Sequence, residues 1–137
     1  MTVVADTGAL YALVDKDDAW HARVVRWWQE TNPAIVVPVT VLPEVTYLLA
    51  SRIGVAAEEA FVAAVVDGEF PVEPLDHEDV RRAAEVMRKY ADLRIGFVDA
   101  SVIAIAERLG TRDLLTTDRR HFGVVRPKHA RSFTLLP

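Results

Sequence analysis

Cysteine is absent from this sequence of 137 residues, and so is any apolar run long enough to form a membrane-spanning helix. Without cysteine the chain can form no disulfide, thiolate nucleophile or zinc–sulfur site, which is typical of a protein from a reducing cytosol. The apolar amino-terminal stretch lacks a basic segment and contains Asp6, which argues against a signal peptide. We therefore expect a cytoplasmic protein that does not associate with a membrane.

An excess of positive charge is lacking as well. The 16 lysines and arginines are outnumbered by 20 aspartates and glutamates, which gives a formal net charge of −4. A protein that coats nucleic acid nonspecifically usually has a broad basic surface, and this composition does not favour one. If nucleic acid is the substrate, a local basic patch or bound metal ions must meet its phosphates.

The composition is otherwise that of a globular protein. Hydrophobic residues make up 51% of the chain and charged residues 26%, so the chain can bury a core and is not expected to be disordered. A length of 137 residues corresponds to one ordinary domain, and we find no internal repeat or linker. We predict a single domain over residues 1–137.

Short apolar runs alternate with longer segments of helical spacing along the chain. Strands are predicted at 3–5, 34–38, 113–117 and 133–137, with 71–75 as an extended edge segment. Helices are predicted at 9–14, 19–31, 44–54, 56–68, 77–91 and 98–109, with 92–96 as a loop. This alternation predicts an α/β fold in which a mostly parallel sheet is flanked by helices on both faces.

Four acidic residues stand where predicted strands end or helices begin. Asp6 closes the first strand, and Asp118 closes the strand 113–117. Glu44 and Asp99 lie in the first turns of two helices. Because ligands of open parallel sheets bind outside the carboxyl ends of the strands, all four side chains could face one edge of the sheet.

Each acid has two interpretations. Asp6 and Asp118 could cap helices, and Glu44 and Asp99 could offset the positive ends of helices. Alternatively, acids that converge in a partly dry cleft repel one another unless a cation is present. Since cysteine is absent and histidines are scattered, oxygen ligands would favour Mg²⁺ or Mn²⁺. Such sites serve phosphodiester hydrolysis, because the metal activates water and neutralises charge on the phosphate.

Four segments carry a resemblance to a known family. They are VVADTGALYAL near the amino terminus, VPVTVLPEVTYLL around Glu44, IGFVDASVIAIAERLG around Asp99 and LLTTDRRHFGVVRP around Asp118. In this order, and over nearly the whole chain, they resemble the PIN-domain ribonucleases, and specifically the VapC toxins of prokaryotic type II toxin–antitoxin modules. The resemblance implies a PIN fold with a central parallel sheet, usually five-stranded, flanked by helices.

The same resemblance implies the reaction and the partners. The acidic quartet of the family, which holds Mg²⁺ or Mn²⁺ for endonucleolytic cleavage of RNA, corresponds to Asp6, Glu44, Asp99 and Asp118. Thr116 matches a hydroxyl residue that the family often places two positions before its last aspartate. On a strand, residues 116 and 118 share one face, so the hydroxyl could bond that carboxylate or a metal-bound water. The family further implies a homodimer, a VapB-type antitoxin partner and a toxin–antitoxin hetero-oligomer.

Basic residues near the motifs give further hypotheses. Arg119 and Arg120 directly follow Asp118 and could pair with RNA phosphates. His121 and His129 are expected near the site, where His121 either anchors a loop or touches the substrate.

Several features stay open at the level of sequence. A surface for dimerisation or antitoxin docking is expected around four residues, Trp27, Trp28, Tyr47 and Leu48. Asp92 is either an outer acid near the metals or a solvated or capping residue of its loop. The RNA target, the number of metals, the dimer geometry and the identity of the antitoxin are not decided by the sequence.

Other functions fit the motifs less well. A phosphoacceptor receiver domain needs adjacent acids after its first strand and a late lysine, but Asp6 is followed by Thr7, and no lysine occurs between Lys89 and Lys128. A haloacid-dehalogenase-type phosphatase needs Asp-x-Asp, and position 8 is glycine. A PIN-like scaffold that binds RNA or a partner without cleaving it stays open as the alternative.

Overall fold

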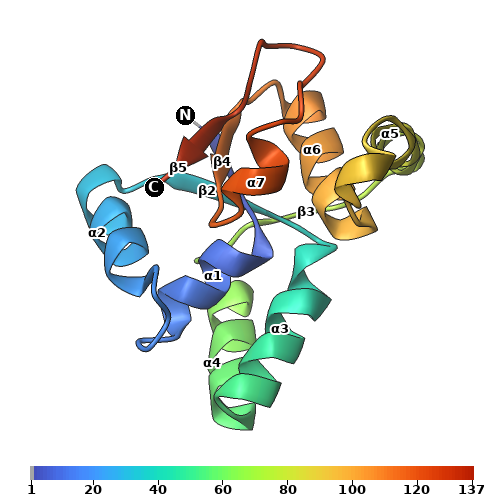
Figure 1. Ribbon diagram of the computed structural model, residues 1–137. Helices are drawn as coiled ribbons and strands as arrows, with labels where there is room; N and C mark the ends of the chain where they lie inside the picture. Colours follow the sequence, from blue (N-terminus) through green and yellow to red (C-terminus); the bar gives the residue numbers. More distant parts are fainter. Residues whose placement is uncertain (1) are drawn as a thin grey trace.

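The computed structural model describes residues 2–137, and its centre is a five-stranded sheet (Figure 1). The strands are β1 (Thr2–Ala5), β2 (Ala34–Pro38), β3 (Val72–Glu73), β4 (Asp113–Leu115) and β5 (Thr134–Leu136). They lie in the order β3–β2–β1–β4–β5, and every neighbouring pair is parallel. The predicted parallel sheet is therefore confirmed, with the segment 71–75 at its edge.

Helices flank this sheet, as the alternating pattern predicts. They are α1 (Thr7–Val14), α2 (His21–Thr31), α3 (Val41–Arg52), α4 (Val55–Val66), α5 (His77–Lys89), the 3₁₀ helix η1 (Ala91–Leu93), α6 (Phe97–Leu109) and α7 (Arg119–Phe122). α5 packs along α6, α1 contacts both α2 and α3, and α3 pairs with α4. In Figure 1 the α3–α4 pair extends away from the sheet. Among residues 2–137, none of the helices combines the length and the apolar character required to span a bilayer.

The middle of the sheet and helix α6 form the core. In β1, Val3, Val4 and Ala5 are fully buried, as expected for a central strand of a parallel sheet. All residues of the segment 100–106 in α6 are buried as well. Because close-packed elements have little freedom to shift, the residue that follows β1 and the first turn of α6 are held firmly in relation to each other.

Several predicted boundaries are wrong: α1 begins at Thr7 rather than at residue 9, α3 begins at Val41 rather than at 44, α4 ends at Val66 rather than at 68, and part of the predicted loop 92–96 belongs to η1. For two further boundaries, a polar side chain explains the error. α2 begins at His21 rather than at residue 19, because Asp18 accepts a hydrogen bond from the Trp20 backbone N–H and forms a turn before the helix. β4 ends at Leu115 rather than at residue 117, because the Thr116 hydroxyl accepts the N–H of Asp118 and the chain leaves the strand. A side chain that bonds its neighbouring backbone competes with regular structure in this way.

Candidate metal centre

Asp6 lies directly after β1, and only 5% of its surface is exposed. Its Oδ2 accepts a hydrogen bond of 3.1 Å from the Thr116 hydroxyl, whereas its Oδ1 is buried without a hydrogen-bond partner. The side chain makes no capping bond to α1, so the capping interpretation is wrong for this residue. Burial, followed by the charges of Asp99 and Glu44, raises the pKa of Asp6 to about 7. The carboxylate is therefore costly to ionise without a cation.

Thr116 connects the two ends of the site. Its side chain is fully buried, donates to Asp6 and accepts the backbone N–H of Asp118 over 2.9 Å. The expectation that Thr116 and Asp118 share one face of a strand is wrong, because β4 ends before both of them. The hydroxyl instead couples the acid that follows β1 to the backbone of the acid that follows β4.

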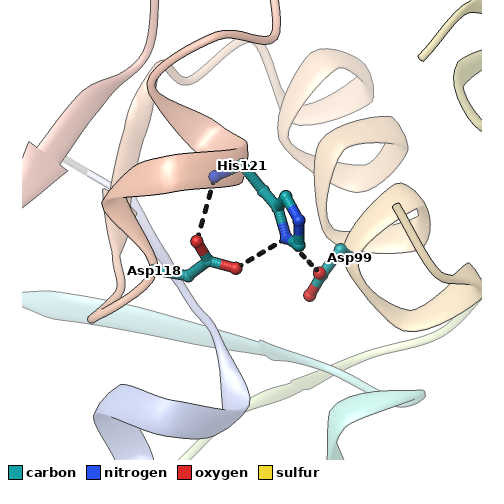
Figure 2. A group of neighbouring side chains, drawn as sticks. All are labelled: Asp99, Asp118 and His121. Carbon is teal, nitrogen blue, oxygen red and sulfur yellow. Dashed lines mark hydrogen bonds and ion pairs between the residues drawn. The ribbon is translucent and has the colours of Figure 1, made fainter. Parts of the chain in front are cut away.

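Asp99, Asp118 and His121 gather at the same edge of the sheet (Figure 2). His121 Nδ1 lies 2.8 Å from Asp118 Oδ2 and 3.6 Å from Asp99 Oδ2. One potential ligand atom from each residue lies within 4.8 Å of the others, so this group could hold a metal ion. Nδ1 is buried and makes no directed hydrogen bond, and the two approaches are ion pairs only when the imidazole is protonated.

Asp118 serves two structural purposes. Its Oδ1 caps α7 by accepting the His121 backbone N–H over 3.0 Å, which confirms the capping interpretation for this residue. Its Oδ2 faces the His121 ring. Capping of α7 therefore fixes the carboxylate in the orientation in which its second oxygen points to the cluster (Figure 2).

Asp99 lies in the first turn of α6, as the sequence predicts. Burial and the charge of Asp118 raise the pKa of Asp99 to about 6, and the charge of Glu44 acts in the same direction. The neighbouring His121 ring opposes this rise. The cluster is thus a place where negative charges face one another in a partly buried setting.

Glu44 completes the set from α3. It lies in the first turn of that helix and is exposed, and its charge contributes to the raised pKa values of both Asp6 and Asp99. The hydroxyl groups of Thr40 and Ser101 share a hydrogen bond, which ties the start of α3 to α6. The structure therefore brings all four predicted acids to one region.

His121 is the residue that the sequence interpretation did not place firmly in the site. The missed signal is the Asp-x-x-His spacing of Asp118 and His121, because residues three apart on a helical turn lie on one side of it. Short helix α7 supplies that turn. The prediction that His129 lies near the site is wrong, because its Nε2 bonds the Thr111 carbonyl, before the amino end of β4.

The remaining candidates differ in their exposure. Arg119 and Arg120 are exposed at the start of α7, beside Asp118. Asp92 is exposed in η1. Among the predicted docking residues, Tyr47 is 70% exposed, whereas the other three pack in part against the core: Trp27, Trp28 and Leu48.

The donor set fits a divalent cation. Oxygen atoms dominate it, and Asp6 Oδ1 is a buried oxygen to which the protein provides no donor. Such an atom is expected to have an unseen partner, and among acids that partner is a cation rather than another acceptor. Carboxylate oxygens favour Mg²⁺ or Mn²⁺, and the imidazole of His121 is also compatible with Mn²⁺.

Comparison with known proteins shows which family the chain belongs to. The family model described as the PIN domain matches residues 3–126, which include all four acids. The chain belongs to the PIN domain family. Over 135 residues, it is 37% identical to Ribonuclease VapC26 of Mycobacterium tuberculosis, a match that covers 98% of this chain and 100% of that protein.

Solved PIN-domain structures resemble the fold. Mycobacterium tuberculosis VapC20, described as a sarcin–ricin loop cleaving toxin, superimposes with a TM-score of 0.83 at 25% identity, covering 94% of this chain and 98% of that one. A chain of VapBC2 from Rickettsia felis gives a TM-score of 0.70 at 14% identity, with both chains covered completely. The second likeness concerns the fold alone. The predicted PIN fold is thereby confirmed.

Proposed function

We propose that this PIN-domain protein is a Mg²⁺- or Mn²⁺-dependent endoribonuclease and the toxin of a VapBC-type toxin–antitoxin module. The observation that carries the proposal is the buried, half-unpartnered carboxylate of Asp6 among other acids, because such a cluster is stable in its charged form only with a cation. The identity to a protein named as a VapC ribonuclease supports the choice of RNA over other phosphodiesters.

Each residue has a proposed part in the reaction. The ion would be held by the quartet of Asp6, Glu44, Asp99 and Asp118. When bound, it would make a water more acidic and offset the negative charge of the phosphate. Thr116 orients Asp6 through its hydroxyl, and it also holds the backbone of Asp118. His121 holds the carboxylates of Asp99 and Asp118 near each other until the ion and the substrate arrive.

The substrate and partners follow from the relatives. VapC20 is described as cleaving the sarcin–ricin loop, so an RNA hairpin of that loop is the first substrate to test. We propose a VapB-type antitoxin as the partner, a homodimer as the free form, and a hetero-oligomer as the inhibited form. The exposed Tyr47 stays a candidate for one of these contacts. Residues 1–137 would act as one domain, and the cytoplasm, where RNA and antitoxin are made, would be the site of action.

The decisive experiment measures cleavage of a labelled RNA hairpin by the purified protein. We expect cleavage with Mg²⁺ or Mn²⁺, none in EDTA, and none with Asp99→Asn, whose helix content and melting profile stay native. Asp92→Asn is the matched control, because it removes an exposed acid from the loop that leads into α6. It should cleave normally.

Two outcomes would contradict the proposal in different ways. Equal cleavage by wild type and Asp99→Asn in EDTA would exclude a metal-dependent site at the cluster. Binding of the hairpin with no cleavage in either metal would favour the alternative, a PIN-like scaffold that binds RNA without cutting it.

A further inference from the structure

Three of the thirteen arginines form ion pairs with Asp or Glu side chains, and the other ten form none within residues 2–137. Arg81, Arg82 and Arg108 form ion pairs with carboxylates on the α5–α6 side of the molecule. Arg23 and Arg119 are among the arginines that no Asp or Glu side chain of residues 2–137 pairs with, although the chain has an excess of acids. Their positive charge is therefore available to an external anion.

Both of these arginines contact one aromatic ring. The guanidinium carbon of Arg23 lies 4.6 Å from the ring centroid of Trp20, and that of Arg119 lies 5.4 Å from it. Both distances are within the range in which a cation is attracted to an indole face. Trp20 is half-buried at the start of α2, and both arginine residues are exposed.

Arg119 connects this group to the acid cluster. It is the residue after Asp118, and one of its terminal nitrogens donates a hydrogen bond to the Pro137 carbonyl, directly after β5. Because β1, β4 and β5 are parallel neighbours, their carboxyl ends share one edge of the sheet. The guanidinium of Arg119 therefore lies at the edge that carries Asp6 and Asp118.

The chemistry of the group suits a phosphate backbone. A guanidinium that stacks on an indole keeps its planar fork of N–H donors oriented and loses little further freedom when it binds an oxyanion. A guanidinium has five N–H donors, so the bond from Arg119 to Pro137 leaves others free. Two such forks beside a cluster of negative charge would offset the repulsion that an approaching polyanion meets there.

We propose that Trp20, Arg23 and Arg119 form a docking site for the phosphates of single-stranded RNA that flank the cleaved bond. We call these three residues the Trp20 platform. This inference rests on the proposed ribonuclease function and adds a path for the strand, which leaves the acid cluster over Arg119 and continues along the first turn of α2. Arg26, one turn further along α2 and exposed, would extend the path.

The test compares two arginine substitutions. Arg23→Ala removes an unpaired guanidinium of the Trp20 platform, and Arg81→Ala removes an exposed guanidinium on α5 that pairs with Glu78. Binding of a labelled RNA hairpin is measured over a range of salt concentrations in the Asp99→Asn background, so that no cleavage occurs. Cleavage kinetics are measured for both substitutions in the active protein.

For Arg23→Ala we expect the slope of log Kd against log salt to fall by about 0.7, which is the loss of one phosphate contact to a single strand. KM should rise about five- to tenfold with kcat unchanged, because the lost contact is made in both ground state and transition state. Arg81→Ala should match wild type in both measurements. Equal behaviour of the two variants would overturn the proposal.

The ring itself is tested with a conservative pair. Trp20→Phe keeps a stacking face and should keep the salt slope, whereas Trp20→Leu should lose at least as much affinity as Arg23→Ala. Thermal melting of both variants shows whether the fold is retained, and Arg23→Ala stays informative if Trp20→Leu fails to fold. A native Trp20→Leu protein with wild-type affinity for RNA would contradict the platform.

Further outcomes distinguish failure of the Trp20 platform from failure of the proposed ribonuclease function. If the wild-type protein neither binds nor cleaves RNA, the proposed function fails and the platform fails with it. If the wild type cleaves RNA while Arg23→Ala keeps its salt slope and KM, only the platform fails. Loss of antitoxin affinity in Arg23→Ala, with RNA affinity unchanged, would assign the residues to a protein partner and also overturn the proposal.

Discussion

Asp6 and Asp79 are the two buried aspartates of residues 2–137, with 5% and 3% of their surfaces exposed, and their surroundings are opposite. Asp79 accepts two contacts of 3.0 and 3.1 Å from Arg108 Nε, and its Oδ2 also accepts the Asp76 backbone N–H in the capping box of α5. Asp6 has no cationic partner and faces the charges of Asp99 and Glu44. Two equally buried carboxylates thus have opposite electrostatic settings.

The difference is the one expected between an acid that stabilises the fold and an acid of the proposed metal site. Around Asp79 the protein supplies the opposite charge itself, and the α5–α6 contact is reinforced by a second pair in which Arg82 holds Glu107 with two hydrogen bonds. Around Asp6 the compensating charge has to come from outside. Uncompensated charge lowers the stability of the fold, and such a loss of stability is common where active sites bind their ligands.

The largest expected effect is stabilisation of the fold by a divalent ion, which would remove the electrostatic difference between Asp6 and Asp79. A saturating divalent ion should give Asp6 the opposite charge that Asp79 already has, so it should stabilise the folded protein. At a concentration one hundred times the dissociation constant, linkage predicts a gain of about 2.7 kcal/mol in the free energy of unfolding. Urea unfolding with and without Mn²⁺ measures this gain, which Asp99→Asn should largely abolish. No change in wild-type stability with Mn²⁺ would contradict a metal site.

The second effect removes the charge of Asp79. Asp79→Asn keeps the size of the side chain but leaves Arg108 with weaker partners, and we expect a loss of about 2 kcal/mol in the free energy of unfolding. Urea unfolding in EDTA provides the value. The isosteric change Asp6→Asn should have the opposite sign under the same conditions, with a gain of about 1 kcal/mol, because it relieves repulsion. A loss in both variants would show that Asp6 is a structural residue.

The third effect concerns pH in the absence of metal. The folded-state pKa values of Asp6 and Asp99 are raised to about 7 and about 6, above the ordinary value of 3.8. The folded protein therefore binds these protons more tightly than the unfolded chain, so their contribution to stability is complete below pH 4 and is lost as the pH rises to about 7. Melting temperatures in EDTA should fall from pH 5 to pH 8.

The same pH series has an internal control. Asp6→Asn should flatten the fall in melting temperature, whereas Asp79→Asn should lower the melting temperature without flattening it. A melting temperature that rises between pH 5 and pH 8 in EDTA would mean that the acids of the cluster are compensated within the protein.

The smallest effect is expected on the exposed rim of the α5–α6 network. Arg81 pairs with Glu78 at 3.3 Å, but both side chains are mostly exposed, at 61% and 73%. Exposed ion pairs contribute little, so Arg81→Ala should change the free energy of unfolding by less than about 0.5 kcal/mol. Chemical denaturation at low and high salt checks this. If Arg81→Ala lost as much free energy of unfolding as Asp79→Asn, exposure would not explain the difference between the Arg81–Glu78 and Arg108–Asp79 pairs.

The fold was largely accessible from the sequence, because its strands and helices differ clearly in apolar spacing. The run from Val3 to Ala5 and the helix from Val98 to Leu109 show their type directly, and their neighbours in the sheet follow from the alternation of elements. Two of the boundary errors fall at residues 18 and 116, where a side chain bonds the backbone two residues further on. Such bonds depend on local geometry that periodicity does not encode.

The candidate site was accessible only in part. The four acids stand at the junctions of elements, and a parallel sheet brings such junctions together. The contact of Thr116 with Asp6 joins residues 110 positions apart, and the place of His121 depends on a four-residue helix. Both require the ends of β1 and β4 to be side by side, which is a property of the sheet order rather than of any local pattern.

The pairing of β1 with β4 also decides when, during synthesis, the acids can meet. β1 comes first along the sequence, whereas its neighbour β4 begins only at Asp113, so more than 100 residues must be made between the two strands. A chain that stops before β4 carries Asp6, Glu44 and Asp99 but lacks Asp118, His121 and the hydroxyl that orients Asp6. If the four acids hold the ion as proposed, a chain that stops before β4 should therefore cleave no RNA.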